Sequence, residues 1–565
     1  MEDSTTLHQL CDAGNWDELL SYLETHSTNH ILLQTQLTSP SGPHEDETPL
    51  CKCALRAPES VITELLALHP PLAATPDRHQ RLPLHWAARR STAICELTDP
   101  PGPDSEAVMR GLAESHPAGL VAEDDEGRTP LHVLFLHHGE SRAVSTVRLL
   151  SATSGGVRPA MVPDREGRLP LHYAVGGGDG VFSQDVIAEM VNADPASVHH
   201  RDKKGRTALH VYLMAGEPLR VNEGGGPFPP ARSVNVINLL LDGEVARLTD
   251  EEGRLPLHCA AEVLALSLLV KDERESQIDA GLGVRGDKAG VVSLRALKVI
   301  VKAYRAALVS GDKRGMTPLH LFLSAAGRVN EWAYERYLEQ VKANGCGPAA
   351  FAVNRIIEQE MLSNLKVFDP PIKILELFCS NPLRSSSDDS PSQSKLSTVY
   401  DSDSSQSTSC APNQPANRLA PETEEQFPPF TATCATKVED EQGRLPLHYA
   451  SLVLPSSQLL SFLLSRSDPT ALLHADNTDV GRTPLHTALA CPHVAPALTK
   501  DQLSLFLDTN VDATESDKGG GVVSGRLALK MCDLTGRYPL HSAAKSGAHC
   551  DILNRLIKEA PLGLG

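Results

Sequence analysis

One short motif recurs along the chain and constrains the fold more than any other feature. It is Leu-Pro-Leu-His or a close variant, usually with an aspartate eight residues before the histidine and a Gly-Arg pair between them, as in residues 164–172. Its histidine occurs at nine positions: His85, His132, His172, His210, His258, His320, His448, His486 and His541. Self-similarity of this kind indicates stacked repeats rather than one globular core.

The residues of the motif predict a turn followed by a helix. An aspartate such as Asp164 bonds its own backbone two residues on, and Gly167 tolerates the left-handed conformation of a tight turn. The proline that follows suits the first turn of a helix, where its missing N–H needs no partner. A threonine before it can cap the same turn. Small residues after the histidine, such as Ala260 and Ala261, let neighbouring helices approach closely.

A second apolar segment with helical spacing follows many copies of the motif. Examples are residues 61–66, 186–191, 236–241, 297–301 and 459–464. Apolar residues at this spacing are typical of an amphipathic helix. One helix-loop-helix pair cannot bury its own apolar face, so the pairs must stack. The sequence therefore predicts an all-α solenoid.

The motif resembles the signature of the ankyrin repeat, Thr-Pro-Leu-His at a period of about 33 residues. The tetrapeptide itself ends at His132, His320 and His486. Residues 48–51 are similar to a degenerate copy with cysteine in the histidine place, and residues 7–14 resemble an amino-terminal copy, which gives eleven units. The resemblance implies an ankyrin-repeat solenoid that binds through its concave side, built from turn tips and inner helices.

The chain departs from the family pattern in two ways. Leucine or tyrosine replaces the threonine at Leu82, Leu169, Leu255, Leu445 and Tyr538, which puts a Thr–His hydrogen bond in doubt in those units. The spacing is also loose. The step from Cys51 to His85 is 34 residues, most others are 38 to 62, and the step from His320 to His448 is 128. We expect the extra residues in loops between the two helices of a unit.

The widest step predicts a division of the chain into two arrays. Residues 380–437 include a Ser-, Asp- and Pro-rich stretch that nearly lacks apolar residues, so we expect a disordered linker there. Residues 1–379 form the predicted amino-terminal array and residues 438–565 the carboxy-terminal one. Two inserted helices are predicted at about 331–365, over 331–342 and 351–365, and residues 372–378 are the delayed outer helix of the unit that begins at His320.

The net charge and the cysteine pattern limit the kinds of partner and the cellular compartments that we expect for this chain. The net charge is −19 and no Lys/Arg run exceeds a pair, which argues against binding of nucleic acid through its backbone. The acidic first residues do not resemble a signal peptide, and no apolar stretch is long enough for a membrane span. Twelve cysteines without C-x-x-C spacing favour a reducing compartment, so we expect an intracellular protein, cytoplasmic or nuclear.

The nine motif histidines are the obvious candidates for chemistry. Their spacing follows the repeat and not a metal geometry, so we expect each to hydrogen-bond backbone where the turn meets the helix. The adjacent pairs at 137–138 and 199–200 do not face one metal ion. The sequence contains no nucleotide-binding, metalloprotease, hydrolase or kinase motif, and we expect no catalytic, cofactor or metal site.

The arginines at the end of the turns form a second ladder. They are Arg81, Arg128, Arg168, Arg206, Arg254, Arg444, Arg482 and Arg537. In one interpretation each is solvated or paired with the aspartate of its turn, since exposed ion pairs contribute little. In another, the guanidinium groups form a row that faces an acidic protein partner. Both can hold in different units.

These features predict a non-catalytic scaffold with other proteins as partners. Fold alone does not decide this, and two alternatives stay open. One is an adaptor or regulatory subunit that recruits an enzyme, for example through residues 331–365. The other is a purely structural spacer.

The serine-rich linker holds candidate phosphorylation sites. Ser385 and Ser386 each have an aspartate three residues on, and Ser390 precedes a proline. Phosphate would add nearly two negative charges at each serine and extend an already acidic segment, unless it met the arginine ladder. An inert tether is the alternative.

Overall fold

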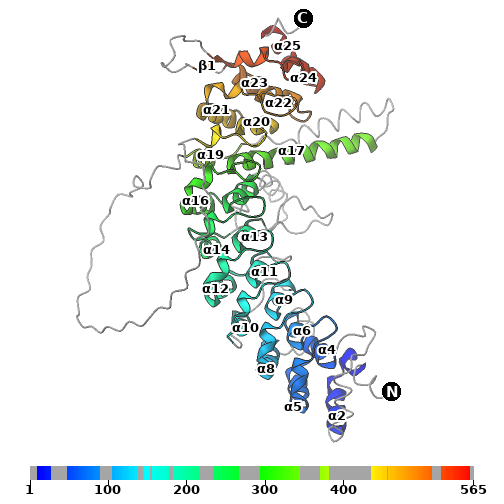
Figure 1. Ribbon diagram of the computed structural model, residues 1–565. Coiled ribbons are helices and arrows are strands. Elements are labelled where there is room, and N and C mark those ends of the chain that lie inside the picture. Colours follow the sequence, from blue (N-terminus) through cyan, green and yellow to red (C-terminus); the bar gives the residue numbers. More distant parts are fainter. Residues whose placement is uncertain are drawn as a thin grey trace, which may run out of the picture.

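The computed structural model describes residues 9–26, 48–89, 105–137, 144–152, 156–176, 182–214, 233–265, 293–343, 369–380, 434–454, 456–508, 510–511 and 523–559. Over these residues the chain forms helical pairs stacked into one elongated array, with the termini at opposite ends (Figure 1). The predicted all-helical solenoid is confirmed.

One layer of the stack consists of inner helices that begin at the proline position of the motif. They are α4 (Pro49–Arg56), α6 (Pro83–Arg89), α9 (Pro130–His137), α11 (Pro170–Gly176), α13 (Ala208–Met214), a helix over 256–265, α17 (Pro318–Ala343), α20 (Pro446–Leu452), α22 (Pro484–Ala490) and α24 (Pro539–Lys545). Inner helices pack on their neighbours along the stack, as α6 does on α4 and α9. Small side chains such as Ala87 and Ala260 are fully buried there, which allows the close approach.

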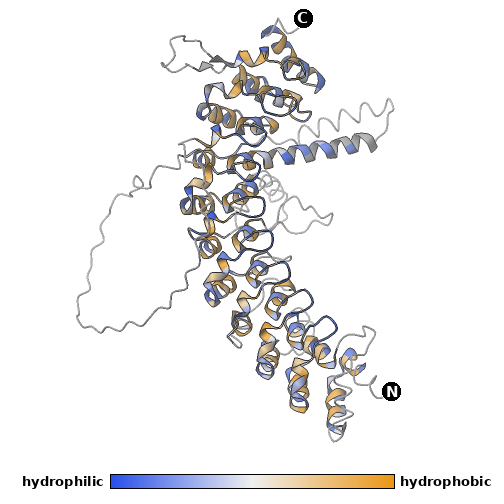
Figure 2. Ribbon diagram, viewed as in Figure 1, coloured by the Kyte–Doolittle hydropathy of each residue, from blue (hydrophilic) through white to orange (hydrophobic). Residues whose placement is uncertain are grey.

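The other layer consists of outer helices. They are α5 (Glu59–Leu68), α8 (Ser105–Ser115), α10 (Val144–Leu150), α12 (Gln184–Ala193), α14 (Val234–Leu240), α16 (Leu294–Ala303), α19 (Ile372–Phe378), α21 (Ser457–Arg466), α23 (Lys500–Leu507) and α25 (Cys550–Glu559), with α2 (Trp16–His26) beside α5. Larger apolar side chains such as Ile62 and Leu65 are buried here. Figure 2 shows apolar residues concentrated on the helices, while the turns on one side are hydrophilic.

Short 3-10 helices lead the chain from an outer helix to the next turn. They are η1 (Pro70–Ala74), η2 (Pro117–Val121), η3 (Pro159–Met161), η4 (Pro195–His199), η5 (Val245–Arg247), η6 (Arg305–Leu308), η8 (Ala435–Lys437), η9 (Pro469–Leu472) and η10 (Gly525–Lys530). Many begin with proline, which stops the preceding α-helix because it cannot donate to that helix's ladder. Within the described residues the one sheet joins β1 (Asn510–Val511) and β2 (Val523–Ser524), antiparallel, with Asn510 opposite Ser524.

The residues predicted as the first inserted helix form the distal part of α17. This helix has 26 residues and runs without a break from the inner-helix position to Ala343. Its first turns pack on α20, and the rest extends away from the stack (Figure 1). A lone glycine, Gly327, does not interrupt it. The second predicted insertion, 351–365, lies outside the described residues.

The units on either side of the predicted linker stack directly on each other. Helix α17 packs on α20, and α19 packs on α21. Residues 381–433 lie outside the described residues, so the linker's disorder and the boundaries of the two arrays stay predictions. The stacking contacts nonetheless continue across this interval of sequence.

The turn glycines supply a test of how closely neighbouring turns approach. Gly253 has a φ of 78°, and a Cβ built on it would lie 2.9 Å from the amide nitrogen of Lys313 in the next unit. Gly536 has a φ of 76°, and its Cβ would meet nothing within 4 Å. We expect Gly536→Ala to cost about 1–2 kcal/mol of left-handed strain, and Gly253→Ala to cost more, because the next turn must also move. Urea unfolding followed by circular dichroism measures both, and equal losses would contradict the close approach.

Candidate functional site

Each motif turn is closed by the side chain of its aspartate. Asp164 Oδ1 accepts hydrogen bonds from the backbone N–H groups of Glu166 at 2.9 Å and Arg168 at 2.7 Å. The Asp164 N–H donates to the carbonyl of Arg168, and the Gly167 N–H donates to that of Asp164. The same aspartate bonds recur in the turns of Asp77, Asp124, Asp202, Asp250, Asp312, Asp440 and Asp533. Each turn is therefore a small rigid unit.

Successive turns are joined by backbone hydrogen bonds. The donors and acceptors are Asp125 N to His79 O at 3.0 Å, Arg165 N to Glu126 O at 3.0 Å, Lys203 N to Glu166 O at 3.0 Å, Glu251 N to Lys204 O at 2.7 Å, Lys313 N to Glu252 O at 3.0 Å, Glu441 N to Arg314 O at 2.8 Å, Asn477 N to Gln442 O at 2.7 Å and Leu534 N to Val480 O at 2.8 Å. We call the joined turns the turn row, which comprises residues 77–81, 124–128, 164–168, 202–206, 250–254, 312–316, 440–444, 476–482 and 533–537. Because every turn is bonded to its neighbour, the row holds its exposed side chains at fixed spacing.

The motif histidines connect each unit to the next. The backbone N–H of Leu169 donates to His172 Nδ1 at 3.1 Å, so this nitrogen carries no proton. The proton is therefore on Nε2, which donates to the carbonyl oxygen of Arg206 in the following unit at 3.2 Å. The equivalent bonds are made by His85, His132, His210, His258, His320 and His448.

A threonine just before the inner helix adds a side-chain contact to this arrangement. The hydroxyls of Thr129, Thr207, Thr317 and Thr483 lie 2.8–2.9 Å from Nδ1 of the histidine three residues on. In the leucine units the backbone N–H alone reaches Nδ1, as Leu169 shows. Replacing threonine by leucine thus removes one hydrogen bond but leaves the histidine in place.

His541 belongs to the last described unit and differs from the others. The Tyr538 N–H donates to its Nδ1 at 3.0 Å, as in the other units. Its ring is exposed, and among the described residues no carbonyl accepts from its Nε2. His541 therefore has the local half of the arrangement without the contact between units.

Burial keeps the other motif histidines neutral. It lowers the pKa of His85, His132, His172, His210, His258, His320 and His448 to about 4, and the carbonyl bonded to Nε2 and nearby aspartates only partly oppose it. Burial also lowers the pKa of His486. Protonating such a ring would also place a hydrogen on Nδ1, where it would face the backbone N–H that donates to this nitrogen. These imidazoles are bound at both nitrogens and are not free to act as bases or metal ligands.

We expect His172→Ala to destabilise its own and the adjacent units by about 1–3 kcal/mol, since it leaves the Leu169 N–H and the Arg206 carbonyl without their buried partner. His541→Ala is the matched control and should have a smaller effect. Denaturant unfolding of both variants measures the difference. Equal effects would show that the contact between units does not carry the stability.

Acidification should unfold the stack through these histidines. Their folded pKa of about 4 lies below the ordinary value of 6.5, so the unfolded chain binds more protons between these pH values. Stability is unaffected above this window and falls as the pH drops through it, by up to about 1.4 kcal/mol per pH unit for each histidine. Urea midpoints at several pH values between 7.5 and 4.5 test this. His172→Ala should make the dependence shallower, and a flat profile would refute the assignment.

Most of the arginines that end the turns contact an aspartate, an aromatic ring or both. Where an aromatic residue follows the histidine, its polar hydrogen occupies the aspartate, as in the 2.6 Å bond from the Tyr173 hydroxyl to Asp164 Oδ2. The Arg168 guanidinium then lies over the Tyr173 ring, 5.2 Å from its centre. Arg81 over Trp86 and Arg444 over Tyr449 repeat this contact.

In three of the units where no aromatic residue follows the histidine, the arginine pairs with the aspartate of its own turn. The N–O distances are 3.0 Å for Arg128–Asp124, 2.7 Å for Arg206–Asp202 and 2.9 Å for Arg254–Asp250. These arginine side chains are only 14–24% exposed. Arg444 pairs with Asp476 of the next unit, Arg482 is half-buried and Arg537 is exposed. A partner-binding role for the eight arginines stays a prediction.

The exposed side chains of the turn row come before these arginines in the chain. In most turns they are the two residues between the aspartate and the glycine. We call these two residues the tip pair of each turn. Six turns have an exposed tip pair that carries charge: Asp125 and Glu126, Arg165 and Glu166, Lys203 and Lys204, Glu251 and Glu252, Lys313 and Arg314, and Glu441 and Gln442. Their charge changes from unit to unit, from acidic through mixed to basic, then acidic, basic and acidic. None of these residues was among the candidates predicted from the sequence, although their variation within a constant motif was the available signal.

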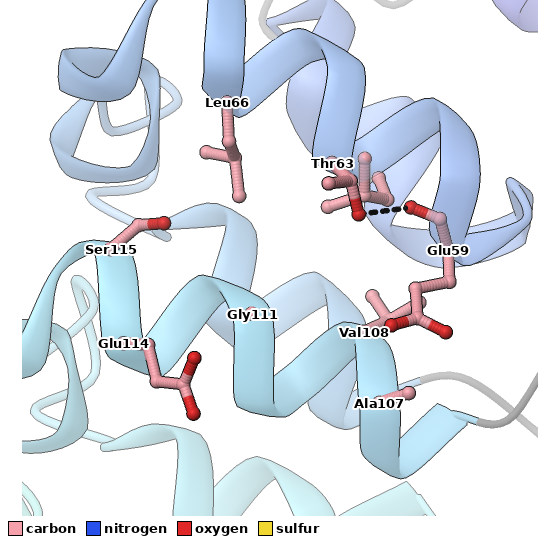
Figure 3. Close-up of a pocket in the computed structure, with 9 residues that line it drawn as sticks. Glu59, Thr63, Leu66, Ala107, Val108, Gly111, Glu114 and Ser115 are labelled. Carbon is pink, nitrogen blue, oxygen red and sulfur yellow. Dashed lines mark hydrogen bonds between the residues drawn. The ribbon is translucent and has the colours of Figure 1, made fainter.

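A shallow depression lies on the outer surface between α5 and α8 (Figure 3). Its volume is about 320 Å³, and Ile62, Leu66 and Val108 line it together with the carboxylates Glu59 and Glu114. The hydroxyl of Thr63 donates to the backbone carbonyl of Glu59 at 2.9 Å, so it is not paired with a base. The depression shows no catalytic arrangement.

The described parts of the chain contain neither a cluster of metal ligands nor a helix that could span a membrane. No three His, Cys, Asp or Glu side chains there are placed to hold a metal ion. No helix there combines the length and apolar character that a membrane crossing needs. The adjacent His199 and His200 point to different partners, Asp242 and the Gly167 carbonyl. Ser385, Ser386 and Ser390 lie outside the described residues.

Comparisons with known proteins give partial matches. No protein-family model matches the chain. It is 25% identical over 174 residues to NF-kappa-B inhibitor delta of Mus musculus, a match that covers 31% of this chain and 46% of that protein. It is 28% identical over 194 residues to inversin of Homo sapiens, covering 34% of this chain and 16% of inversin. It is 27% identical over 176 residues to inversin of Mus musculus, covering 31% and 14%. The matches span less than half the length of each of these relatives.

Proposed function

Because the chain is an ankyrin-repeat protein, as are the relatives it matches, we propose that it is a non-catalytic scaffold that binds other proteins through its turn row and inner helices. The observation that carries this proposal is the series of tip pairs. They are the variable, exposed part of a turn whose remaining residues are committed to hydrogen bonds. Such a surface carries specificity without disturbing the fold.

The rigidity of the turn row favours binding. Aspartate bonds fix each turn, and backbone bonds fix its distance from the next, so little conformational entropy is lost when a partner docks. The alternation from the basic pair at Lys203 to the acidic pair at Glu251 and the basic pair at Lys313 favours a partner with a complementary series of charges. Charge patterns of this kind govern selectivity and association rate more than affinity.

The assignment as a non-enzyme rests on how the polar groups are used. The buried histidines are neutral and bonded at both nitrogens, and the turn aspartates accept backbone hydrogen bonds. The net charge of −19 disfavours nucleic acid as a partner. All described cysteines are free thiols, which favours an intracellular location, cytoplasmic or nuclear. The exposed arginines, Arg537 above all, would extend the binding surface toward an acidic partner.

Charge reversal at one tip pair tests the proposal. In Lys203→Glu/Lys204→Glu the tip changes sign while the backbone bonds of the turn remain, so we expect loss of a discrete subset of partners with unchanged stability. Arg295→Glu/Lys298→Glu is the matched control, because these exposed residues of the outer helix α16 give the same change in net charge. Affinity purification of the full chain with quantitative mass spectrometry measures the partners.

The outcome distinguishes the surfaces. If both double variants lose the same partners, net charge and not the turn row would explain binding. If neither loses any, the turn row would not be the binding surface. The absence of specific partners for the unmodified chain would leave the structural spacer as the better description.

A second candidate is an adaptor or regulatory subunit that recruits an enzyme. The distal part of α17 favours it, because this helix extends beyond the stack and adds nothing visible to the turn row (Figure 1). Replacing residues 331–365 by a short Gly-Ser linker tests it. Loss of a co-purifying enzyme, with the other partners retained, would support the adaptor.

A further inference from the structure

Two cysteines meet where the chain leaves one unit and enters the next. Cys379 ends α19 and Cys434 precedes η8, and the two are separated in sequence by residues 380–433. The Cys434 Sγ lies 3.7 Å from the backbone carbonyl oxygen of Cys379, to which its thiol can donate, and each thiol shifts the pKa of the other. Both are free thiols. The fold thus brings together two sulfur atoms that lie far apart in the chain.

The two sulfur atoms have different surroundings. Cys379 is buried, with 7% of the residue exposed, whereas Cys434 is half-buried. The hydroxyl of Thr436 lies 3.4 Å from Cys434 Sγ. The hydrogen bond with Cys379 lowers the pKa of the Cys434 thiol to about 5 against the effect of burial, and Thr436 and the positive charge of Arg466 act in the same direction. The same hydrogen bond, together with burial, raises the pKa of Cys379.

This asymmetry matches the roles of an attacking and a resolving cysteine. A thiolate is the reactive form of cysteine, and an exposed thiolate near positive charge is the form that peroxides oxidise. The second thiol must lie beside the first to resolve the product, and Cys379 does. The contrast with Cys11 and Cys53 is informative. Their sulfur atoms are 3.5 Å apart, but both residues are buried and neither offers an oxidant access.

We propose that Cys434 and Cys379 form a reversible disulfide in response to hydrogen peroxide, with Cys434 as the attacked sulfur and Cys379 as the resolving one. The Cys434 thiolate attacks one peroxide oxygen, which breaks the O–O bond and yields a sulfenic acid and hydroxide. The Cys379 thiol then attacks the Cys434 sulfur, and the S–S bond forms as the sulfenic oxygen leaves as water with the thiol proton. Two electrons pass from the two sulfurs to the peroxide, and a dithiol reductant reverses the step.

The disulfide would close the ends of the interval 380–433, where the unit of His320 meets the unit of His448. It would join Cys379, after α19, to Cys434, before η8, which leads into the turn of the next unit. These units otherwise meet through α17 on α20 and α19 on α21. A covalent bond at the outer edge of this junction would hold the stack together where the largest interval of sequence interrupts it. Oxidation would thereby fix the relative position of the turns on either side.

Peptide mapping of the full-length protein tests the proposal. The protein is treated with hydrogen peroxide, free thiols are alkylated, and trypsin then releases Cys379 within residues 374–384 and Cys434 within residues 419–437. We expect these two peptides joined by a disulfide that dithiothreitol removes. Cys410, in the peptide 396–418, is the internal competitor. A disulfide from Cys434 to Cys410, or no disulfide at all, would overturn the proposal.

Two variants test the order of attack. In Cys379→Ser the sulfenic acid has no resolving partner, so dimedone should label Cys434 on the order of tenfold more than the exposed Cys550. In Cys434→Ser, dimedone labelling of Cys379 and the disulfide should both be lost. Cys550→Ser is the matched control and should change neither. If dimedone labelled Cys379 in Cys434→Ser as strongly as it labels Cys434 in Cys379→Ser, the assigned roles would be wrong. The mapping of the unmodified protein decides the disulfide itself even if a variant folds poorly.

Discussion

The hydrogen bond from a buried imidazole to a carbonyl of the next unit is the contact on which the stack depends. It ties the start of one inner helix to the turn of its neighbour, as from His172 to Arg206, and it recurs from His85 to His448. The bond exists in this form only for the neutral ring protonated at Nε2. That tautomer is set locally by a backbone N–H three residues earlier. A single residue type therefore fixes both the entry of its own helix and the position of the following unit.

Loose spacing between the motifs is tolerated because this contact involves the motif alone. His172 reaches a carbonyl 34 residues on, and His320 reaches one 124 residues on, with nearly the same distance between the atoms. Whatever lies between the helices of a unit does not enter the geometry of the bond. The same independence explains how leucine replaces threonine at Leu169, where the backbone donor remains.

Much of the fold was predictable from the sequence, because turn, proline and histidine recur in one order. The inner helices begin where the proline predicted, and segments such as 186–191 are outer helices. The continuity of α17 was not predicted, since the motif says where an inner helix begins and nothing about where it ends. The tip pairs were also missed. Residues that recur in most copies of the motif are those that hold the turn together, such as Arg206, which pairs with Asp202. The residue types at the positions of the exposed Lys203 and Lys204 differ from unit to unit. Cys379 and Cys434 come together because the units on either side of residues 380–433 stack on each other. No local sequence pattern predicts that contact.

The stacking of α17 on α20 has a consequence for the order in which the chain assembles. Most unit interfaces join residues about 34 to 58 apart, but this one closes an interval of 124. The entropy of closing a loop grows with the logarithm of its length, so this interface costs about 1 kcal/mol more to form than one across 34 residues. Units on either side can each nucleate and grow from their own local contacts. During synthesis the first group of units would then already be folded when the second emerges, and the junction would form last, by docking of two preassembled surfaces.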